Sequence, residues 1–323
     1  MTTRRSTLIT LVSSSTLSAI SLAQGTYPTK PISVIVPFAA GGNLDVVTRL
    51  VAVSMSRSLG QPFVVDNRVG AGGVIGHQAG SKALADGYTL TATANGSFAV
   101  TPRLQANSPF KSDDFIPVGT IAATPLVFEV PAGSRFRSMV ELLQFARANP
   151  QQVNVGHSGN GTTNHVAILL LQEAAQVKFN IIPYKGSSPA LSDLLGGQID
   201  AMVDQLPSSL SHLQAGKLKA LAVTSLARAS DLPSIPTMNE IGLKEFDVST
   251  ITGMLVPAKT PDSVVLTLNR ALNTALREPS VQLRLRELGS EPRSSTPVQF
   301  KTFLLQEERK AQMLVQRGLL KDE

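Results

Sequence analysis

Two glycine-rich loops are the parts of this sequence best suited to bind a small molecule. The first covers residues 37–43, follows the strand pattern of residues 32–36 and precedes a helical pattern. Gly41 and Gly42 let backbone amides approach a ligand closely, and the helix that starts near Asn43 offers unpaired N–H groups and a partial positive charge. The loop therefore predicts an anion-binding site.

The first loop also has a structural alternative, because tight strand-to-helix turns commonly need glycine. Asn43 is a good helix N-cap, and Asp45 in the first turn would complement the helix dipole. The loop has neither the Lys-Ser/Thr ending of a nucleotide P-loop nor the third glycine of a dinucleotide fingerprint.

The second loop, residues 156–165, follows the strand pattern of residues 153–155 and shows the same order of strand, glycine-rich loop and helix. It is rich in glycine and hydroxyl side chains and runs into another helical pattern, so it also favours negative charge. Its candidate ligand residues are Ser158, Gly159, Asn160, Gly161, Thr162 and Thr163. Two such anion-binding sites, one in each predicted domain, suggest a ligand with two anionic ends held across a cleft.

Three further polar side chains are expected near this cleft. Asp204 follows the strand pattern of residues 199–203 and could receive an ammonium or hydroxyl group, with a loop or capping role as an equal alternative. Tyr184 and Lys185 could line the same cleft, and Lys185 could equally be a surface charge.

The sequence offers little for catalysis, metal binding or cofactor binding. His157 and His165 have no acidic partner at a recognised metal-ligand spacing, so capping or packing roles are favoured. No serine completes a nucleophile-elbow pattern with a later histidine. We predict a protein that is not an enzyme and has no catalytic residue, metal or cofactor; a hydrolase that uses Ser158 is the weaker alternative.

The composition is that of a folded chain. Its 323 residues, 42% hydrophobic and 16% charged, suffice for two compact domains. The absence of cysteine excludes disulfides, thiolate metal sites and a lipid-modified N-terminal cysteine. The formal charge of +6 comes from 29 basic and 23 acidic residues spread thinly along the chain, so nucleic acid is not a predicted partner.

Residues 1–23 have the pattern of a cleaved export signal. Arg4 and Arg5 precede an uncharged, apolar-rich stretch, and Ser21 and Ala23 have the small-residue spacing that a signal peptidase reads. Loss of the two arginines would lower the charge from +6 to +4. We expect a periplasmic protein without a lipid anchor, exported by the general or the twin-arginine route.

Short β-branched stretches alternate with longer helical patterns after residue 28, which predicts an α/β fold with mainly parallel sheets flanked by helices. The strand patterns of residues 126–130 and 252–256 are expected to cross between two domains and act as a hinge. The first domain would cover residues 24–125 and resume at 252–323. The second domain, residues 126–251, would be inserted between these parts.

The last predicted segment is helical. Thr260-Pro261 and Thr296-Pro297 have the cap-and-proline pattern of helix starts. The basic and acidic residues of these helices are interleaved, which indicates a solvated face and not a nucleic-acid surface.

Seven motifs spread over almost the whole mature chain match one family of proteins. They are residues 27–32, 36–45, 66–73, 86–90, 183–186, 193–197 and 232–237. On these motifs the chain resembles the Bordetella uptake gene family, whose members are the periplasmic solute-binding components of tripartite tricarboxylate transporters.

The resemblance implies a two-domain periplasmic-binding-protein fold of type II. The first loop would hold a ligand carboxylate partly through ordered water, residues 158–163 would hold its far end, and Asp204 would meet an amine if the ligand is an amino acid. Residues 93–98 line the cleft in relatives. The implied ligand residues of the first domain are Phe38, Ala40, Gly41, Gly42, Asn43, Asp45, Asn95 and Ser97.

Known ligands of the family are tricarboxylates, dicarboxylates, acidic amino acids and aromatic carboxylates. This sequence departs from the family at Ala39 and Ala40, which replace a common Pro-Pro pair, and at residues 93–98 with Thr101 and Pro102, which differ from the usual histidine- and asparagine-containing segment. The ligand type therefore stays open.

The predicted function is capture of a small carboxylate in the cleft, followed by hinge closure, in a monomer that feeds transporter membrane subunits. The alternative is an extracytoplasmic sensor that reports to a membrane kinase.

Overall fold

The computed structural model describes residues 27–104 and 107–320, so the predicted export signal lies outside the described residues. The strands are β1 (Ile32–Val36), β2 (Phe63–Asn67), β3 (Thr89–Ala94), β4 (Phe115–Pro131), β5 (Asn154–His157), β6 (Asn180–Pro183), β7 (Ala201–Gln205), β8 (Leu218–Val223), β9 (Ser249–Pro257) and β10 (Glu291–Pro292).

Helices cover both groups of strands. They are α1 (Asn43–Leu59), α2 (Val74–Ser81), α3 (Asn95–Ala99), α4 (Met139–Ala148), α5 (Thr163–Ala175), α6 (Ser187–Leu195), α7 (Leu206–Gln214), α8 (Asp262–Arg277), α9 (Pro279–Glu287) and α10 (Pro297–Gln316). Short 3-10 turns are formed by Ala71–Gly73, Thr101–Leu104 and Ser112–Asp114.

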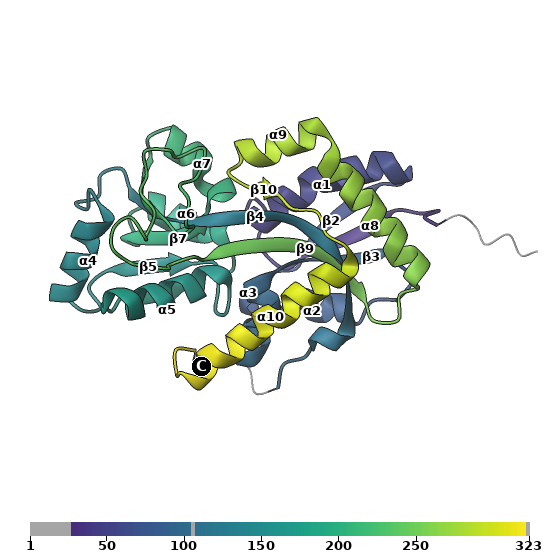
Figure 1. The fold of residues 1–323 in the computed structure, drawn as a ribbon, viewed down its shortest axis with the longest axis horizontal. Helices are drawn as coiled ribbons and strands as arrows, with labels where there is room; N and C mark the ends of the chain where they lie inside the picture. Colours follow the sequence, from purple (N-terminus) through teal and green to yellow (C-terminus); the bar gives the residue numbers. More distant parts are fainter. Residues whose placement is uncertain (1–26, 105–106, 321–323) are drawn as a thin grey trace, which may run out of the picture.

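Two parallel groups of strands are joined by two long antiparallel strands (Figure 1). In one group β1 lies between β2 and β3, and in the other β5 lies between β6 and β7, with all of these pairs parallel. The strands β4 and β9 run between the groups and pair with each other. The predicted α/β class with two parallel sheets and two crossover strands is confirmed.

The strand β4 belongs to both halves of the molecule. Its residues 115–125 pair with β9, whereas residues 126–131 pair with β7 and β8. Sequence analysis found the second half of β4 and missed the first, where Pro117 and Pro125 weaken the strand pattern because proline cannot donate to the ladder. The chain therefore passes from one half to the other inside one continuous strand.

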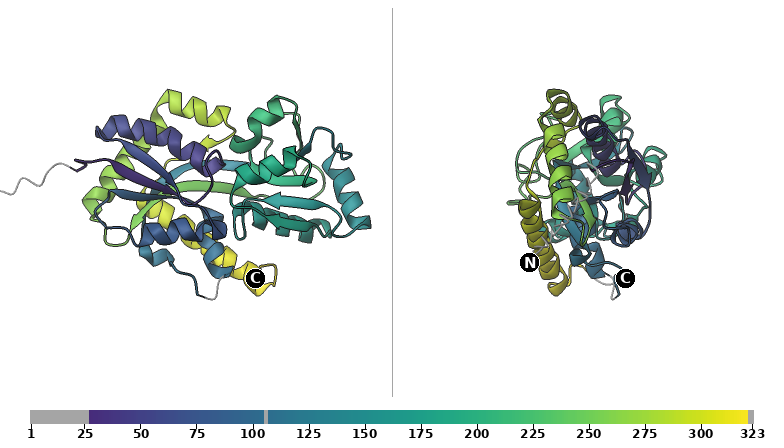
Figure 2. Two further views of the ribbon diagram at one scale, coloured as in Figure 1. Left: turned by 180° about the vertical axis from the view of Figure 1, so that it is seen from behind. Right: turned by 90° about the vertical axis from the view of Figure 1, so that its right-hand side faces the viewer.

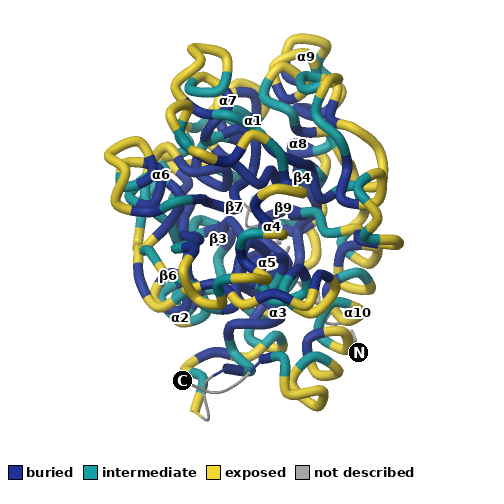
Figure 3. Tube along the Cα trace, turned by 90° about the vertical axis from the view of Figure 1, so that its left-hand side faces the viewer, coloured by how far each residue is buried: buried dark blue, intermediate teal, exposed yellow. Residues whose placement is uncertain are grey.

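Each half has its own apolar core. One core is built on β1, β3, α1 and α8 and includes Val34, Val51 and Leu272. The other is built on β4, β5, α4 and α5 and includes Phe128 and Leu142. The left view of Figure 2 shows the two halves side by side, and Figure 3 shows buried strands inside and exposed outer turns of the helices. The boundaries at residues 126 and 252 stay a prediction.

Two helix starts differ from the sequence-based expectation. The N-cap of α1 is Gly42, and Asn43 is the first helical residue. The helix α8 starts at Asp262 with Pro261 as its N-cap, and the Thr260 hydroxyl donates to the Pro257 carbonyl at 2.7 Å instead of capping the helix. The capping box at Thr296 is confirmed by reciprocal hydrogen bonds with Gln299.

The charged face predicted for the last helices is also confirmed. Arg284 pairs with Glu287 at 3.0 Å and Lys310 pairs with Glu307 at 2.7 Å, with both basic side chains largely exposed. Among the described residues, no helix combines the length and the apolar character needed to cross a membrane.

Candidate functional site

Three helices begin next to one cavity between the two halves. α1 begins at Asn43 in the first half, and α5 and α6 begin at Thr163 and Ser187 in the second. The cavity leaves about 30 Å³ for the centres of water molecules, enough for a few waters. Its lining residues are Phe38, Gly42, Asn43, Leu44, Ala94, Ser97, Ser158, Thr162, Thr163, Asn164, Ser187, Gln205 and Thr250.

None of the described residues that line this cavity has a charged side chain. The first N–H groups of a helix lack a carbonyl partner within the helix and carry partial positive charge. Three helix starts can therefore neutralise an anion without a lysine or arginine. Side chains of Ser97, Ser158, Thr163, Asn164 and Gln205 add neutral polar groups around the same space.

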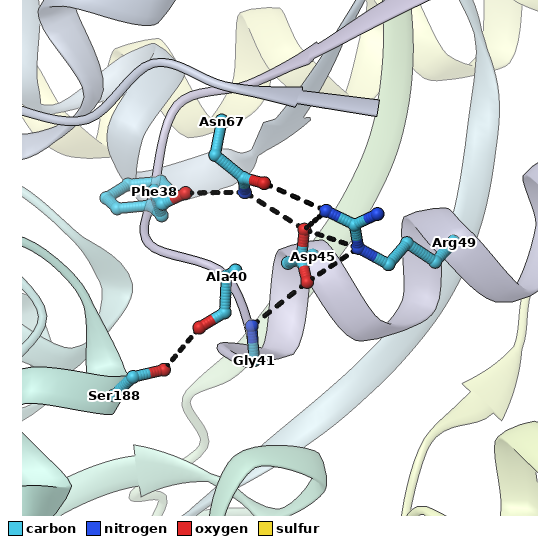
Figure 4. Close-up of polar contacts among 7 residues, drawn as sticks. All are labelled: Phe38, Ala40, Gly41, Asp45, Arg49, Asn67 and Ser188. Carbon is cyan, nitrogen blue, oxygen red and sulfur yellow. Dashed lines mark hydrogen bonds and ion pairs between the residues drawn. The ribbon is translucent and has the colours of Figure 1, made fainter. Parts of the chain in front are cut away.

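A buried carboxylate braces the first loop from behind (Figure 4). Asp45 accepts from the Gly41 amide at 3.0 Å, from Arg49 Nε at 2.9 Å to each oxygen, and from Asn67 Nδ2 at 2.9 Å. The Asn67 amide also donates to the Phe38 carbonyl at 2.9 Å. Asp45 thus ties the loop to α1 and to the end of β2.

These contacts determine which backbone groups of the first loop remain for a ligand. Burial raises the pKa of Asp45, but hydrogen bonds from Arg49 and the Gly41 amide bring the net pKa below its usual range. Because Gly41 donates to this carboxylate, the cavity is lined by Gly42, Asn43 and Leu44 instead. Asp45 and Gly41 therefore lie behind the cavity wall.

Ala40 takes part in a contact between the two halves. The Ser188 hydroxyl donates to the Ala40 carbonyl at 2.7 Å, across the mouth of the first loop (Figure 4). The residue is exposed and does not line the cavity.

Two stacked histidines support the second loop. The rings of His157 and His165 lie 4.7 Å apart at an interplanar angle of 11°, and the Gly161 amide donates to His165 Nδ1 at 3.1 Å. Burial lowers the pKa of His157 to about 3 and that of His165 to about 4, so both rings are neutral near neutral pH. Their packing and capping roles agree with the interpretation favoured by the sequence.

Asp204 is fully buried behind the second half of the cavity. Its carboxylate accepts from Ser187 Oγ at 2.6 Å, from Asn164 Nδ2 at 3.1 Å and from Ser208 Oγ. Burial raises its pKa to about 6 despite these hydrogen bonds. Asp204 does not line the cavity itself but binds Ser187 and Asn164, which do.

Sequence analysis missed six lining residues: Leu44, Ala94, Asn164, Ser187, Gln205 and Thr250. Gln205 connects two of them, since its Nε2 donates to Asn164 Oδ1 and to Thr250 Oγ1, both at 2.8 Å. One signal could have revealed Ser187, because Gly186-Ser187 repeats the strand–glycine–helix pattern of the two predicted loops. Thr250 is the second residue of β9 and has no comparable local signal.

Several predicted residues lie outside the main cavity. Gly159, Asn160, Tyr184 and Lys185 line a neighbouring cavity of about 330 Å³ together with Gly72 of the first half.

Tyr184 also makes a side-chain contact, and two more predicted residues, Gly161 and Asn95, lie elsewhere. The Tyr184 hydroxyl donates to Asp193 at 2.7 Å, Gly161 lies against Thr101, and Asn95 lines a third cavity of about 550 Å³ beside α10. The predicted residues on the main cavity are Phe38, Gly42, Asn43, Ser97, Ser158, Thr162 and Thr163.

Two α/β domains joined by crossover strands, with helix N-termini around an interdomain cavity, are the architecture of periplasmic binding proteins. The family model of the tripartite tricarboxylate transporter family receptor, TctC, matches residues 47–319. The chain belongs to this family of periplasmic solute-binding proteins.

Similar proteins agree with this assignment along most of the chain. A UPF0065 protein from the tcbD-tcbE intergenic region of Pseudomonas sp. (strain P51) is 42% identical over 273 residues, covering 84% of this chain and 81% of that protein. Protein BugT of Bordetella pertussis is 38% identical over 291 residues, covering 90% and 89%.

Three solved structures have the same fold. The periplasmic binding protein BugD has a TM-score of 0.87 at 36% identity, with 91% of this chain and all of that chain covered. MatC of Rhodopseudomonas palustris, solved with bound malate, has a TM-score of 0.85 at 31% identity and covers 90% and 100%. A second R. palustris protein, solved with adipate, has a TM-score of 0.87 at 32% identity and covers 90% and 97%.

Proposed function

We propose that this protein captures a small carboxylated metabolite in the periplasm and delivers it to the membrane subunits of a tripartite tricarboxylate-type transporter. The meeting of three helix N-termini at a cavity without a charged side chain in its described lining carries this proposal. Such a cavity stabilises a carboxylate through backbone N–H groups and rejects a cation.

Each half of the site would bind one part of the ligand. Amides at the start of α1, near Asn43 and Leu44, would receive one carboxylate, and those at the start of α5, near Thr163 and Asn164, would receive the other end. Hydroxyl and amide side chains would orient the ligand, and bridging waters would fill remaining space. Ligand contacts on both sides then favour the closed arrangement of the domains.

Short dicarboxylates are the first ligand class to test. The relatives solved with malate and adipate support this choice, because both molecules carry two carboxylates. The small cavity, which lies between two halves that are already in contact, also favours a compact ligand. Asp204 would act on this ligand indirectly, by holding Ser187 and Asn164 in place.

Thermal unfolding of purified protein tests the proposal. The probes are citrate, succinate, malate, adipate, aspartate, glutamate and nicotinate, each at about 1 mM, with succinamide as a neutral control for succinate. At least one carboxylate should raise Tm by about 5 °C, and succinamide should not, because selective binding to the folded state stabilises it. Absence of a shift with all carboxylates, or an equal shift with succinamide, would refute the carboxylate function.

A further inference from the structure

The helix α3 of the first domain is seated directly on the N-terminus of α5 of the second. A Cβ atom at Gly96 would lie 2.2 Å from the Thr163 backbone nitrogen and 2.6 Å from the Thr162 carbonyl carbon. Both neighbours are backbone atoms of the opposite domain, so a side-chain rotation cannot relieve the overlap. The backbone of Gly96 is helical, and space is therefore the reason why this position requires glycine.

The preceding residue connects the same helix start to the hinge. Asn95 Oδ1 accepts from the Thr163 hydroxyl at 3.1 Å and from the Ile251 amide in β9 at 3.1 Å. Asn95 Nδ2 donates to Glu307 Oε2 in α10 at 2.8 Å. One buried amide side chain thus touches the ligand-facing helix α5, a crossover strand and the C-terminal helix.

We infer that Asn95 and Gly96 form a closure junction, at which the N-terminus of α5 docks onto the first domain and is positioned for the ligand. These two are positioning residues, because neither lines the main cavity. Thr163 is the link, since its hydroxyl meets Asn95 and it also lines that cavity. The inference rests on the proposed function insofar as closure serves ligand capture, but its test needs no ligand.

Other glycines at the domain boundary do not provide so clean a test. Gly72, whose added Cβ would meet the Asn160 carbonyl oxygen at 2.2 Å, has a φ of 60°, and Gly161 against Thr101 has a φ of 76°. A side chain at either position would add backbone strain to the loss of contact. Gly96→Ala avoids that strain, because alanine favours the helical conformation of this position.

Cross-linking across the cleft measures closure directly. The chain has no natural cysteine, so Ala40→Cys and Ser188→Cys, placed where the Ser188 hydroxyl meets the Ala40 carbonyl at 2.7 Å, would be the only thiols. A short bismaleimide joins them when the domains close. The cross-linking rate of this double-cysteine parent is compared with the rates of the same protein carrying Gly96→Ala or Gly96→Val. Gly133→Ala and Gly133→Val are the matched controls, since an added Cβ at Gly133 meets nothing within 4 Å.

We expect Gly96→Ala to slow cross-linking by about tenfold and Gly96→Val to slow it further, with both Gly133 controls within about twofold of the parent. Each variant is also reacted with a monofunctional maleimide, which should label both thiols at the parental rate if both domains fold normally. Equal cross-linking rates for the Gly96 variants and the parent would overturn the inference. Slow cross-linking accompanied by altered monofunctional labelling and lost circular dichroism would overturn it too, because Gly96 would then be needed for folding and not for closure.

The result separates this inference from the proposed function. Slow cross-linking of Gly96→Ala in a protein that no carboxylate stabilises would support the junction and refute the carboxylate ligand. Unchanged cross-linking in a protein that binds a carboxylate would refute the junction alone.

Discussion

The two domains present helix N-termini to the same cavity but brace them by different chemistry. In the first domain a charged network holds the loop, with Asp45 bound to Arg49, whose side chain is 48% exposed. In the second domain buried groups do this work, namely the stacked neutral rings of His157 and His165 under the second loop and the carboxylate of Asp204 behind Ser187 and Asn164. The two anion-binding helix N-termini are therefore held by different contacts, and each set of contacts should respond to different conditions.

The largest expected effect is the loss of Asp204, which holds helix starts in the second domain. Asp204→Ala should lower the free energy of unfolding by about 3–5 kcal/mol, because the buried hydroxyl and amide donors around it lose their acceptor. Urea unfolding measures this change. The exposed Asp113→Ala variant is the control, and a similar loss in both variants would contradict a special role for Asp204.

A smaller effect is expected from the first-domain network. Asp45→Ala removes the acceptor of the Gly41 amide, Arg49 and Asn67, and should lower the free energy of unfolding by about 2 kcal/mol. Ligand affinity should fall by about tenfold as the loop loosens. Calorimetric titration with the carboxylate that gives the largest thermal shift measures this affinity. The control Asp66→Ala removes an exposed partner of Arg68 and should leave the affinity unchanged. Equal losses of affinity in both variants would refute the role of Asp45 in holding the loop.

The pH dependence distinguishes the two supports. His165 has a pKa of about 4 in the folded protein, below its unfolded value of about 6.5. The unfolded chain therefore binds more protons, and stability falls as pH drops from about 6.5 toward 4. At about pH 5 this single histidine should cost about 2 kcal/mol relative to about pH 7.

The variant His165→Gln isolates this contribution, since glutamine keeps an acceptor near the Gly161 amide but does not titrate. Its loss of stability between about pH 7 and about pH 5 should be smaller than that of the parent by about 2 kcal/mol. The comparison of slopes is needed because burial raises the pKa values of Asp204 and Glu129, which favours the folded state as pH falls. Parallel pH profiles would show that the ring is not held neutral.

Salt should have the smallest effect. Raising NaCl from about 0.05 to about 0.5 M screens the half-exposed Arg49 contact with Asp45, and exchange of the Gly41 amide should become about twofold faster. The Gly161 amide, bound to the neutral His165, should keep its exchange rate. Hydrogen exchange followed by NMR measures both amides, and equal acceleration would remove the contrast between the domains.

The sequence predicted the two-domain α/β fold and two of the three helix N-termini, because strand, glycine and helix stand next to one another in each loop. It could not show which way acidic side chains point. Asp45 and Asp204 each follow a binding loop or strand, yet neither lines the cavity, and both bind donors that are distant in sequence, such as Asn67 and Ser187.

Tertiary placement also decides the remaining lining residues. Gln205 and Thr250 come from the ends of β7 and β9, and their hydrogen bond closes a gap of 45 residues in the sequence. No local pattern encodes that contact. Asn95 is the converse case, since a residue expected at the ligand is instead placed at the junction of α5, β9 and α10.

A crystal structure of the protein with the carboxylate that gives the largest thermal shift tests the central claim most directly. We predict that the carboxylate oxygens lie within hydrogen-bond distance, about 3 Å, of first-turn amide nitrogens of both α1 and α5, directly or through one water. A carboxylate paired instead with a basic side chain such as Lys185, outside the cavity formed by the helix starts, would contradict the account.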